Sequence, residues 1–225
     1  MPIEVHVVRV FTDEDGRHGN PLGIVDASML PAAERQGLAK LLGFSETVFV
    51  DLPSPGASIA RAQIFTPATE LPFAGHPTVG LSWWLTEQGR GVTALDVPAG
   101  RVATSDRHGA TWVRAQPEWA PDFALYPLPD LHDVLHAHPR DFAEGHHYVW
   151  AWEDEVEGRI RSRMFAPGLG IPEDEATGAA AVRITAHLRR SLLINQGRGS
   201  QIRTKFDDDW VEVGGRVRPD RTFTV

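Results

Sequence analysis

The sequence predicts an α+β protein made of two similar halves. Three observations support this: strand-forming segments recur along most of the chain, one strong helical segment comes late in each half, and one strand–turn–helix segment occurs twice. The 225 residues are enough for two small domains, and 42% hydrophobic residues suffice for a packed core. We predict domains over residues 1–105 and 106–225, with the break anywhere from about 100 to 130. The C-terminal strand is a candidate to return to the first domain.

Strands are predicted where β-branched and aromatic residues cluster between turn-forming residues. In the first half these segments are residues 3–11, 22–25, 45–50, 59–65, 93–97, 102–104 and 111–115. Residues 28–42 predict a helix that ends at Gly43. Leu38, Leu41 and Leu42 fall on one face of this helix, which is the pattern of a helix packed on a core.

Each half also contains one stronger helical segment. Residues 76–88 predict a helix with Pro77 in its first turn and Gly89 at its end. Residues 177–193 predict the second, because the segment is rich in alanine. The second half also predicts a loop with one short helix at 128–136, and strands at 148–152, 160–165, 201–205, 210–213 and 222–225.

Residues 61–78 and 161–177 resemble each other. An arginine, a phenylalanine and two prolines recur at a common offset, and a threonine then follows with one residue fewer in the second copy. Chance combined with shared turn chemistry is the alternative explanation. A true repeat predicts halves related by a pseudo-two-fold axis, with two helix N-termini facing each other across a cleft. Their free backbone N–H groups and positive dipole ends predict a site for an anion such as a substrate carboxylate.

Composition narrows the classes of partner. The formal net charge of -8 and the pI of about 5.7 argue against nucleic acid and anionic membranes, which both need a basic face. The chain has no cysteine, which excludes disulfides, thiolate metal sites and thiol nucleophiles. Neither a signal peptide nor a membrane-spanning run is evident, so we expect a cytoplasmic protein.

Several motifs occur in a fixed order: Gly19-Asn20-Pro21, Phe44-Ser45-Glu46-Thr47-Val48-Phe49, Phe65-Thr66-Pro67, Glu70-Leu71-Pro72-Phe73-Ala74-Gly75-His76-Pro77-Thr78, and Glu173-Asp174-Glu175-Ala176-Thr177-Gly178-Ala179-Ala180. In this order they resemble the PhzF family, which shares the diaminopimelate epimerase fold. The resemblance covers residues 1 to about 190, as far as pattern comparison locates it. It implies two similar domains, each a β-barrel around a central helix, with the active site between them.

The resemblance also implies an isomerase that moves a proton on a small carboxylate-bearing metabolite in biosynthesis. It implies a homodimer and catalysis without metal or cofactor. The family's proton-shuttling glutamate corresponds to Glu46, and the flanking histidine and aspartate correspond to His76 and Asp174. The implied substrate-binding residues are Asn20, Ser45, Gly75, Thr177, Gly178 and Ala179.

The residues themselves leave alternatives open. Partial burial predicts a raised pKa for Glu46, which suits a group acting as both base and acid, but its position alone favours a solvated glutamate. His76 suits hydrogen bonding or proton relay, or only local bonds at a helix start. Asp174 suits substrate orientation, or capping of the second helix, or both. Asn20 suits substrate bonding, or only the turn before Pro21.

This chain departs from the family pattern in three ways. It is shorter than most members, and we place the shortening in the second half, between the first central helix and Phe165. Glu175 stands where proline is usual, and Ala179 stands where serine is usual. Racemases on this fold use two cysteines at the two helix starts, and we place Ala74 and Ala176 there. With no cysteine in the chain, two-thiol racemisation cannot occur.

Other functions stay open. A cyclase or a lyase on the same scaffold is one alternative, and a non-catalytic small-molecule binding protein is another. A histidine-rich stretch suggests a metal, but its spacing matches no zinc helix, and a solvated loop is favoured. Its histidines are His132, His136, His138, His146 and His147. We therefore predict no metal site.

Overall fold

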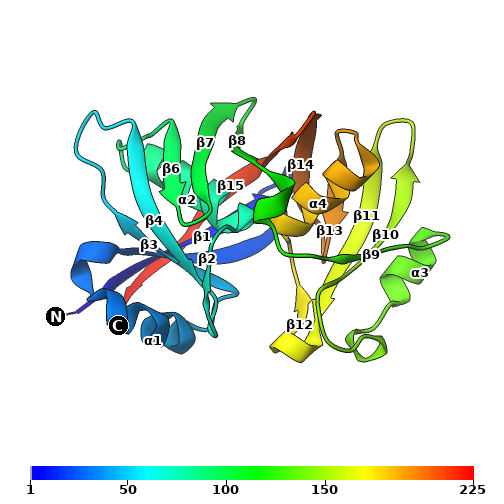
Figure 1. The fold of residues 1–225 in the computed structure, drawn as a ribbon, viewed down its shortest axis with the longest axis horizontal. Helices are drawn as coiled ribbons and strands as arrows, with labels where there is room; N and C mark the ends of the chain where they lie inside the picture. The colour runs from blue at the N-terminus through cyan, green and yellow to red at the C-terminus, as the bar shows by residue number, and fades with distance from the viewer. Residues whose placement is uncertain (1) are drawn as a thin grey trace.

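The computed structural model describes residues 2–225 as two halves lying side by side (Figure 1). The helices are α1 (Ala32–Leu42), α2 (Gly75–Glu87), α3 (Leu131–His136) and α4 (Gly178–Leu188). The strands are β1 (Glu4–Thr12), β2 (His18–Asp26), β3 (Glu46–Asp51), β4 (Ile59–Phe65), β5 (Glu70–Leu71), β6 (Ala94–Val97), β7 (Gly100–Arg107), β8 (Ala110–Ala115), β9 (Ala124–Pro127), β10 (His147–Asp154), β11 (Arg159–Ala166), β12 (Ile171–Asp174), β13 (Leu193–Gln196), β14 (Ser200–Asp207) and β15 (Trp210–Thr224).

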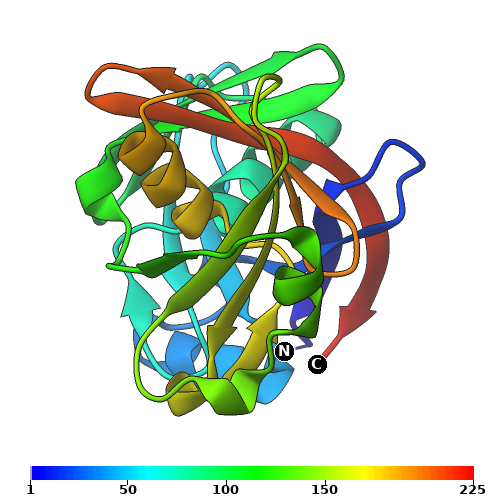
Figure 2. The ribbon, with the colours of Figure 1, turned by 90° about the vertical axis from the view of Figure 1, so that its right-hand side faces the viewer.

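The last strand, β15, joins the two halves. Its first part pairs with β14 and β8, and its second part pairs with β1. The path from β1 through β8 therefore closes through β15 into a barrel. Inside it, α2 contacts β1, β2, β3, β7, β8 and β15. Figure 2 shows β15 as one long curved strand beside the N-terminal strand. The sequence predicted two separate strands in this stretch, and the structure has one.

The predicted repeat is confirmed by the strand pairing. In the first half β2 and β3 are parallel, β3 and β4 antiparallel, and β4 and β6 parallel. Strands β9, β10, β11 and β13 repeat this pattern. Strands β8 and β15 pair so that Val113 lies opposite Val213, at the same offset that relates Arg61 to Arg161. The pseudo-two-fold axis therefore passes close to this pair, and the two-domain α+β fold class is confirmed.

The second half is a less complete barrel than the first. Within residues 2–225, β9 pairs only with β10, so the sheet has an open edge there. Between β8 and β10 the chain contributes only β9 and short helices. The strands that would complete the second barrel are therefore missing from this stretch. On α4, Arg183 spans the gap and donates hydrogen bonds to the carbonyls of Ala120 and Pro121 at 2.6 and 3.0 Å.

The helix predicted at 177–193 is too long. It ends at Leu188 because Arg189 adopts φ 51°, a left-handed conformation, and the chain then turns into the unpredicted strand β13. Strands β9 and β12 were also missed, because both are short and contain proline. The main hydrophobic cluster contains side chains from both halves, so the halves share one core. Within residues 2–225, each helix is too short or too polar to cross a membrane.

Candidate active site

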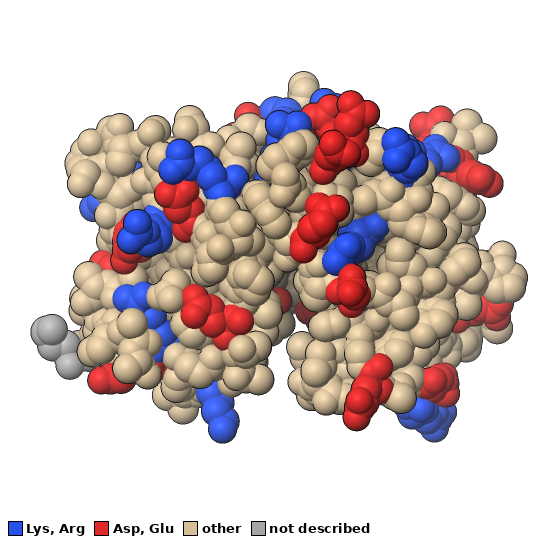
Figure 3. Space-filling view, viewed as in Figure 1, with Lys and Arg blue, Asp and Glu red and all other residues tan. Residues whose placement is uncertain are grey.

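The two central helices meet at their N-termini. Gly75 begins α2 and Gly178 begins α4. A Cβ atom added to Gly75 would lie 2.9 Å from the carbonyl carbon of Gly178, and one added to Gly178 would lie 2.7 Å from the backbone nitrogen of His76. Only glycine allows this approach. In the space-filling view a groove opens between the two halves in the lower part of the molecule, beside β12 (Figure 3).

These helix ends offer unused backbone donors. The first hydrogen bonds closing the helical turns run from Thr78 N to Ala74 O at 3.3 Å and from Ala181 N to Thr177 O at 3.0 Å. The N–H groups that precede them, at Gly75, Gly178 and Ala179 among others, have no acceptor within their helix. Two adjacent positive dipole ends favour a bound anion. Ala179, in the first turn of α4, carries one of these backbone N–H groups.

The contact between Gly75 and Gly178 corrects the register of the repeat. These glycines are equivalent, so the residues before them, Ala74 and Thr177, are equivalent too. The sequence comparison matched Thr177 with Thr78, and this register is wrong. The cause is the length of the connection: Gly75 follows Phe65 by ten residues, whereas Gly178 follows Phe165 by thirteen. The placement of Ala74 and Ala176 at the family's cysteine positions remains a prediction.

Glu46 and His76 form an ion pair at this junction. Glu46 begins β3, and His76 is the second residue of α2. Oε2 of Glu46 lies 3.1 Å from Nδ1 of His76, with side-chain exposures of 17% and 3%. The contact between His76 Nδ1 and Glu46 Oε2 is not aligned as a hydrogen bond. Within residues 2–225 the other ring nitrogen, the buried His76 Nε2, also has no hydrogen-bond partner. The histidine thus has a free nitrogen inside the site.

The pKa of Glu46 lies below its usual value, although its burial acts in the opposite direction. The charge of His76, together with contacts from the His76 ring and the Ser45 hydroxyl, outweighs desolvation. The prediction of a raised pKa for Glu46 is therefore wrong, because His76 and Ser45 lower the pKa by more than burial raises it. The family resemblance placed His76 in the same site as Glu46, but the sequence did not show that its ring would lie against the Glu46 carboxyl.

Asp174 is held by hydrogen bonds to both carboxylate oxygens. Asn20 Nδ2 donates to Oδ1 at 2.8 Å, and the Thr177 hydroxyl donates to Oδ2 at 2.6 Å. Asn20 Nδ2 also donates to the Ala176 carbonyl at 3.0 Å, so both hydrogens of this amide are used within the protein. Ser45 Oγ donates to Asn20 Oδ1 at 3.4 Å. The structure therefore brings Asn20, Ser45, Thr177 and Asp174 together, with Asn20 and Thr177 serving Asp174.

Gln196, at the end of β13, is a site residue that the sequence did not suggest. It is fully buried, accepts a hydrogen bond from Thr177 N at 3.2 Å, and donates to the Asp174 carbonyl at 3.1 Å and to Thr177 Oγ1 at 2.9 Å. Because Thr177 Oγ1 accepts from Gln196, its own hydrogen points to Asp174. A glutamine beside Gly197 at a strand end carries no sequence signal for this role.

Burial raises the pKa of Asp174 to about 6, and the nearby charge of Glu46 adds to the effect. The same carboxyl in the unfolded chain titrates near 3.8. The folded protein therefore binds this proton more tightly, so the contribution of Asp174 to stability is present below about pH 4 and is lost as the pH rises through about 6.

We expect the Asp174→Asn variant to be free of this loss. Relative to the variant, wild type should lose up to about 3 kcal/mol of unfolding free energy between about pH 4 and 7. Urea denaturation of both proteins across this range measures the difference. Parallel stability curves for the two proteins would contradict a raised pKa at Asp174.

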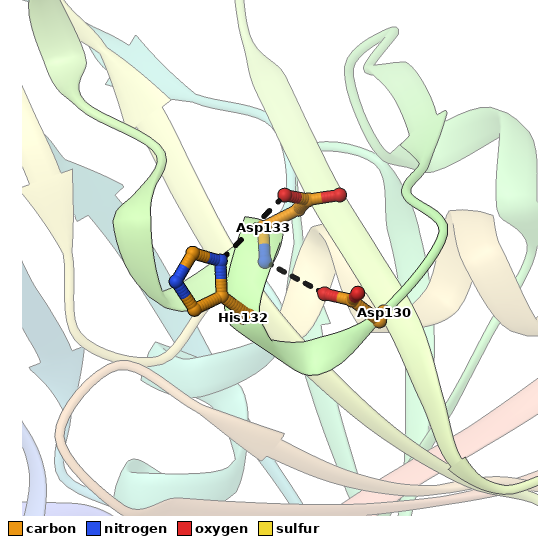
Figure 4. A group of neighbouring side chains, drawn as sticks. All are labelled: Asp130, His132 and Asp133. Atoms are coloured by element: carbon orange, nitrogen blue, oxygen red, sulfur yellow. Dashed lines mark hydrogen bonds and ion pairs between the residues drawn. The ribbon is translucent and has the colours of Figure 1, made fainter.

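The exposed stretch around α3 contains a group of side chains that resembles a metal site. Asp130, His132 and Asp133 lie close together, and all three are exposed (Figure 4). Asp130 Oδ1 accepts a hydrogen bond from Asp133 N at 3.0 Å, which caps α3. His132 and His136 stack on each other with ring centroids 4.0 Å apart. Capping and stacking account for this group, and it lies outside the Glu46 site.

Comparison with known proteins gives a consistent result. The family model described as PhzC-PhzF, phenazine biosynthesis-like protein, matches residues 8–122 and 118–207. The trans-2,3-dihydro-3-hydroxyanthranilate isomerase of Pseudomonas fluorescens is 31% identical, over 82% of this chain and 79% of that protein. The crystal structure of a Bacillus anthracis phenazine biosynthesis protein of the PhzF family matches with a TM-score of 0.78, at 22% identity, over 100% of this chain and 99% of that one. A hydroxyproline epimerase from Agrobacterium vitis has the same fold, with a TM-score of 0.65 at 13% identity, over 100% and 92% of the two chains.

Proposed function

The chain belongs to the PhzC-PhzF family of phenazine biosynthesis-like proteins, and from this we propose that it is an isomerase that moves a proton on a small carboxylate-bearing metabolite. Glu46 is the proposed acid and base. A relative that is 31% identical over most of both chains is named as an isomerase, which supports the reaction class. The predicted homodimer and cytoplasmic location remain predictions.

The unequal environment of the two carboxyl groups is the observation that carries the proposal. Asp174 has both oxygens engaged by Asn20 and Thr177 and a pKa raised to about 6. Glu46 has a lowered pKa, and within residues 2–225 its buried Oε2 has no well-aligned hydrogen-bond donor. A carboxyl pair whose pKa values are pushed apart is typical of acid–base sites. Of the two, Glu46 is the carboxyl with the less engaged oxygens, and we propose it as the one that accepts a proton from a ligand.

The proposed step conserves atoms and electrons. Glu46 takes a proton from one carbon of the substrate, the electron pair of that C–H bond moves into the adjoining unsaturated system, and the same carboxyl returns the proton to another carbon of that system. The free N–H groups of α2 and α4 bind the substrate carboxylate. His76 holds the Glu46 carboxyl in place and offers Nε2 to the substrate. Each step is a proton transfer, so the proposal assigns no role to a metal or cofactor.

Turnover in deuterated water tests this reaction. We expect the protein to convert trans-2,3-dihydro-3-hydroxyanthranilate, or a related cyclic carboxylate, into an isomer that carries solvent deuterium at one carbon. Mass spectrometry and proton NMR detect the label and its position. A product that has lost water would indicate a lyase or a cyclase. If all of these compounds stayed unchanged but one of them raised the melting temperature of the protein, a binding protein would be indicated.

A further inference from the structure

Glu175, the residue after Asp174, links the segment between β12 and α4 to the turn between β13 and β14. Its Oε1 accepts hydrogen bonds from Arg198 N at 3.0 Å and from Ser200 Oγ at 2.8 Å. The Glu175 side chain is only 13% exposed, whereas its ion-pair partner Arg198 is 79% exposed. The contacts that hold this carboxylate are therefore chiefly the ones made by the turn.

Ser200 carries this link into the first half of the protein. Its side chain is fully buried, and its Oγ accepts a hydrogen bond from the backbone N–H of Gly19 at 3.0 Å. Because a backbone N–H can only donate, the hydroxyl hydrogen of Ser200 is left for Glu175. A continuous chain of hydrogen bonds thus runs from Gly19 through Ser200 to Glu175.

This chain runs beside the hydrogen bond at the centre of the site. Gly19 is the residue before Asn20, and Glu175 is the residue after Asp174. The Asn20 amide donates to Asp174 at 2.8 Å. The hydrogen bonds of Gly19 and Glu175 with Ser200 therefore join the two halves next to Asn20 and Asp174, whose side chains meet in the site.

The turn is shaped to accept the carboxylate. A Cβ atom on Gly197 would lie 2.7 Å from Glu175 Oε2, and one on Gly199 would lie 2.8 Å from the ring of His18. Both glycines also have positive φ angles, 60° and 144°. Side chains at these positions would push the turn away from Glu175 and from the strand that carries Gly19.

We propose that Glu175 is a positioning residue that, through Ser200, fixes Asp174 relative to Asn20 and so sets the rate of the reaction. This inference rests on the proposed function. The proposed role is carried by the hydrogen bond that Glu175 accepts from Ser200. Glutamine at this position still offers an acceptor oxygen, so it should preserve the role. The alternative is a merely structural contact, which would affect stability and leave turnover unchanged.

Kinetics of four single variants and one double variant test the role. Glu175→Ala should lower kcat by about 100-fold with KM within about threefold, since small displacements of site groups have effects of this size. Glu175→Gln should keep kcat within about threefold, because it retains the bond from Ser200. Ser200→Ala should be impaired, and adding it to Glu175→Ala should cause no further loss, because both remove the same link. Glu173→Ala is the matched control: its carboxylate binds Arg163, and it should stay within about twofold of wild type.

A second measurement does not depend on the substrate. Hydrogen exchange of the Gly19 amide should be at least about tenfold faster in Glu175→Ala and close to wild type in Glu175→Gln. Unchanged exchange, wild-type kcat in Glu175→Ala, or equal losses in the alanine and glutamine variants would each overturn the inference. Faster exchange in Glu175→Ala, with no turnover even by wild type, would instead count against the proposed function alone.

Discussion

Replacing Glu46 with glutamine should lower kcat by about 1,000-fold or more, while the affinity for ligand changes by less than about tenfold. Glutamine keeps the shape of the side chain, so the groove and the helix ends remain available to the substrate. It cannot accept a proton from carbon and return it. The loss should therefore appear in kcat and in deuterium incorporation, and much less in binding.

We expect Asp174 not to replace Glu46 in this variant. Asn20 and Thr177 each donate a hydrogen bond to one of its oxygens, and Gln196 fixes the direction of the Thr177 hydroxyl hydrogen. These bonds hold the Asp174 carboxyl in one orientation, so it is not free to turn toward the substrate carbon. The hydrogen-bond arrangement thus predicts an asymmetric pair, in which one carboxyl moves the proton and the other holds the site in shape.

Glu70→Gln is the matched control for Glu46→Gln. Glu70 also begins a strand, β5, but its side chain is exposed and accepts a hydrogen bond from Gln63 at 2.8 Å. We expect kcat within about twofold of wild type, as for most surface changes. Measurable turnover by Glu46→Gln at the wild-type rate would exclude Glu46 as the shuttle. Equal ligand binding by Glu46→Gln and an inactive wild type would favour a binding protein.

The sequence predicted the residues of the site better than their environment. The order of the motifs located Glu46, His76 and Asp174, and the structure brings them to one junction. The direction of the Glu46 pKa was wrong, because it depends on His76, thirty residues away, at a distance that only the folded chain defines. Propensity and periodicity describe neighbours along the chain, and a pKa responds to neighbours in space.

The same limit explains which parts of the fold were missed. Strand β13 has four residues, so it carries too little pattern to stand out from the helix before it. It nevertheless supplies Gln196, and the turn after it supplies Arg198 and leads to Ser200. The strong signals of β4 and of the helix at 75–87 were predicted almost to the residue. Long periodic segments were readable, and the short segments that complete the site were not.

Replacing Gly178 with alanine should destabilise the protein by about 3 kcal/mol, a cost typical of an added group that meets fixed atoms. The new Cβ atom would lie 2.7 Å from the His76 nitrogen and 2.9 Å from the carbonyl carbon of Gly75. Both are backbone atoms, so no rotamer change can relieve the overlap. The two helix ends would have to separate by roughly 1 Å to restore ordinary contact distances. Such a shift would also move His76 and the free N–H groups, so kcat should fall by about 100-fold even in the folded fraction.

Gly37→Ala is the opposite case and serves as the control. Gly37 lies in the exposed middle of α1, and an added Cβ atom would have no atom within 4 Å. Alanine there should stabilise the protein by about 0.5–1 kcal/mol, because the helix gains propensity and the unfolded chain loses freedom. Urea denaturation should thus show opposite changes in stability for the two glycine-to-alanine substitutions, and kcat should fall only in Gly178→Ala. If Gly178→Ala behaved like Gly37→Ala, the helix ends would not be in contact, and the anion site they are proposed to form would lose its basis.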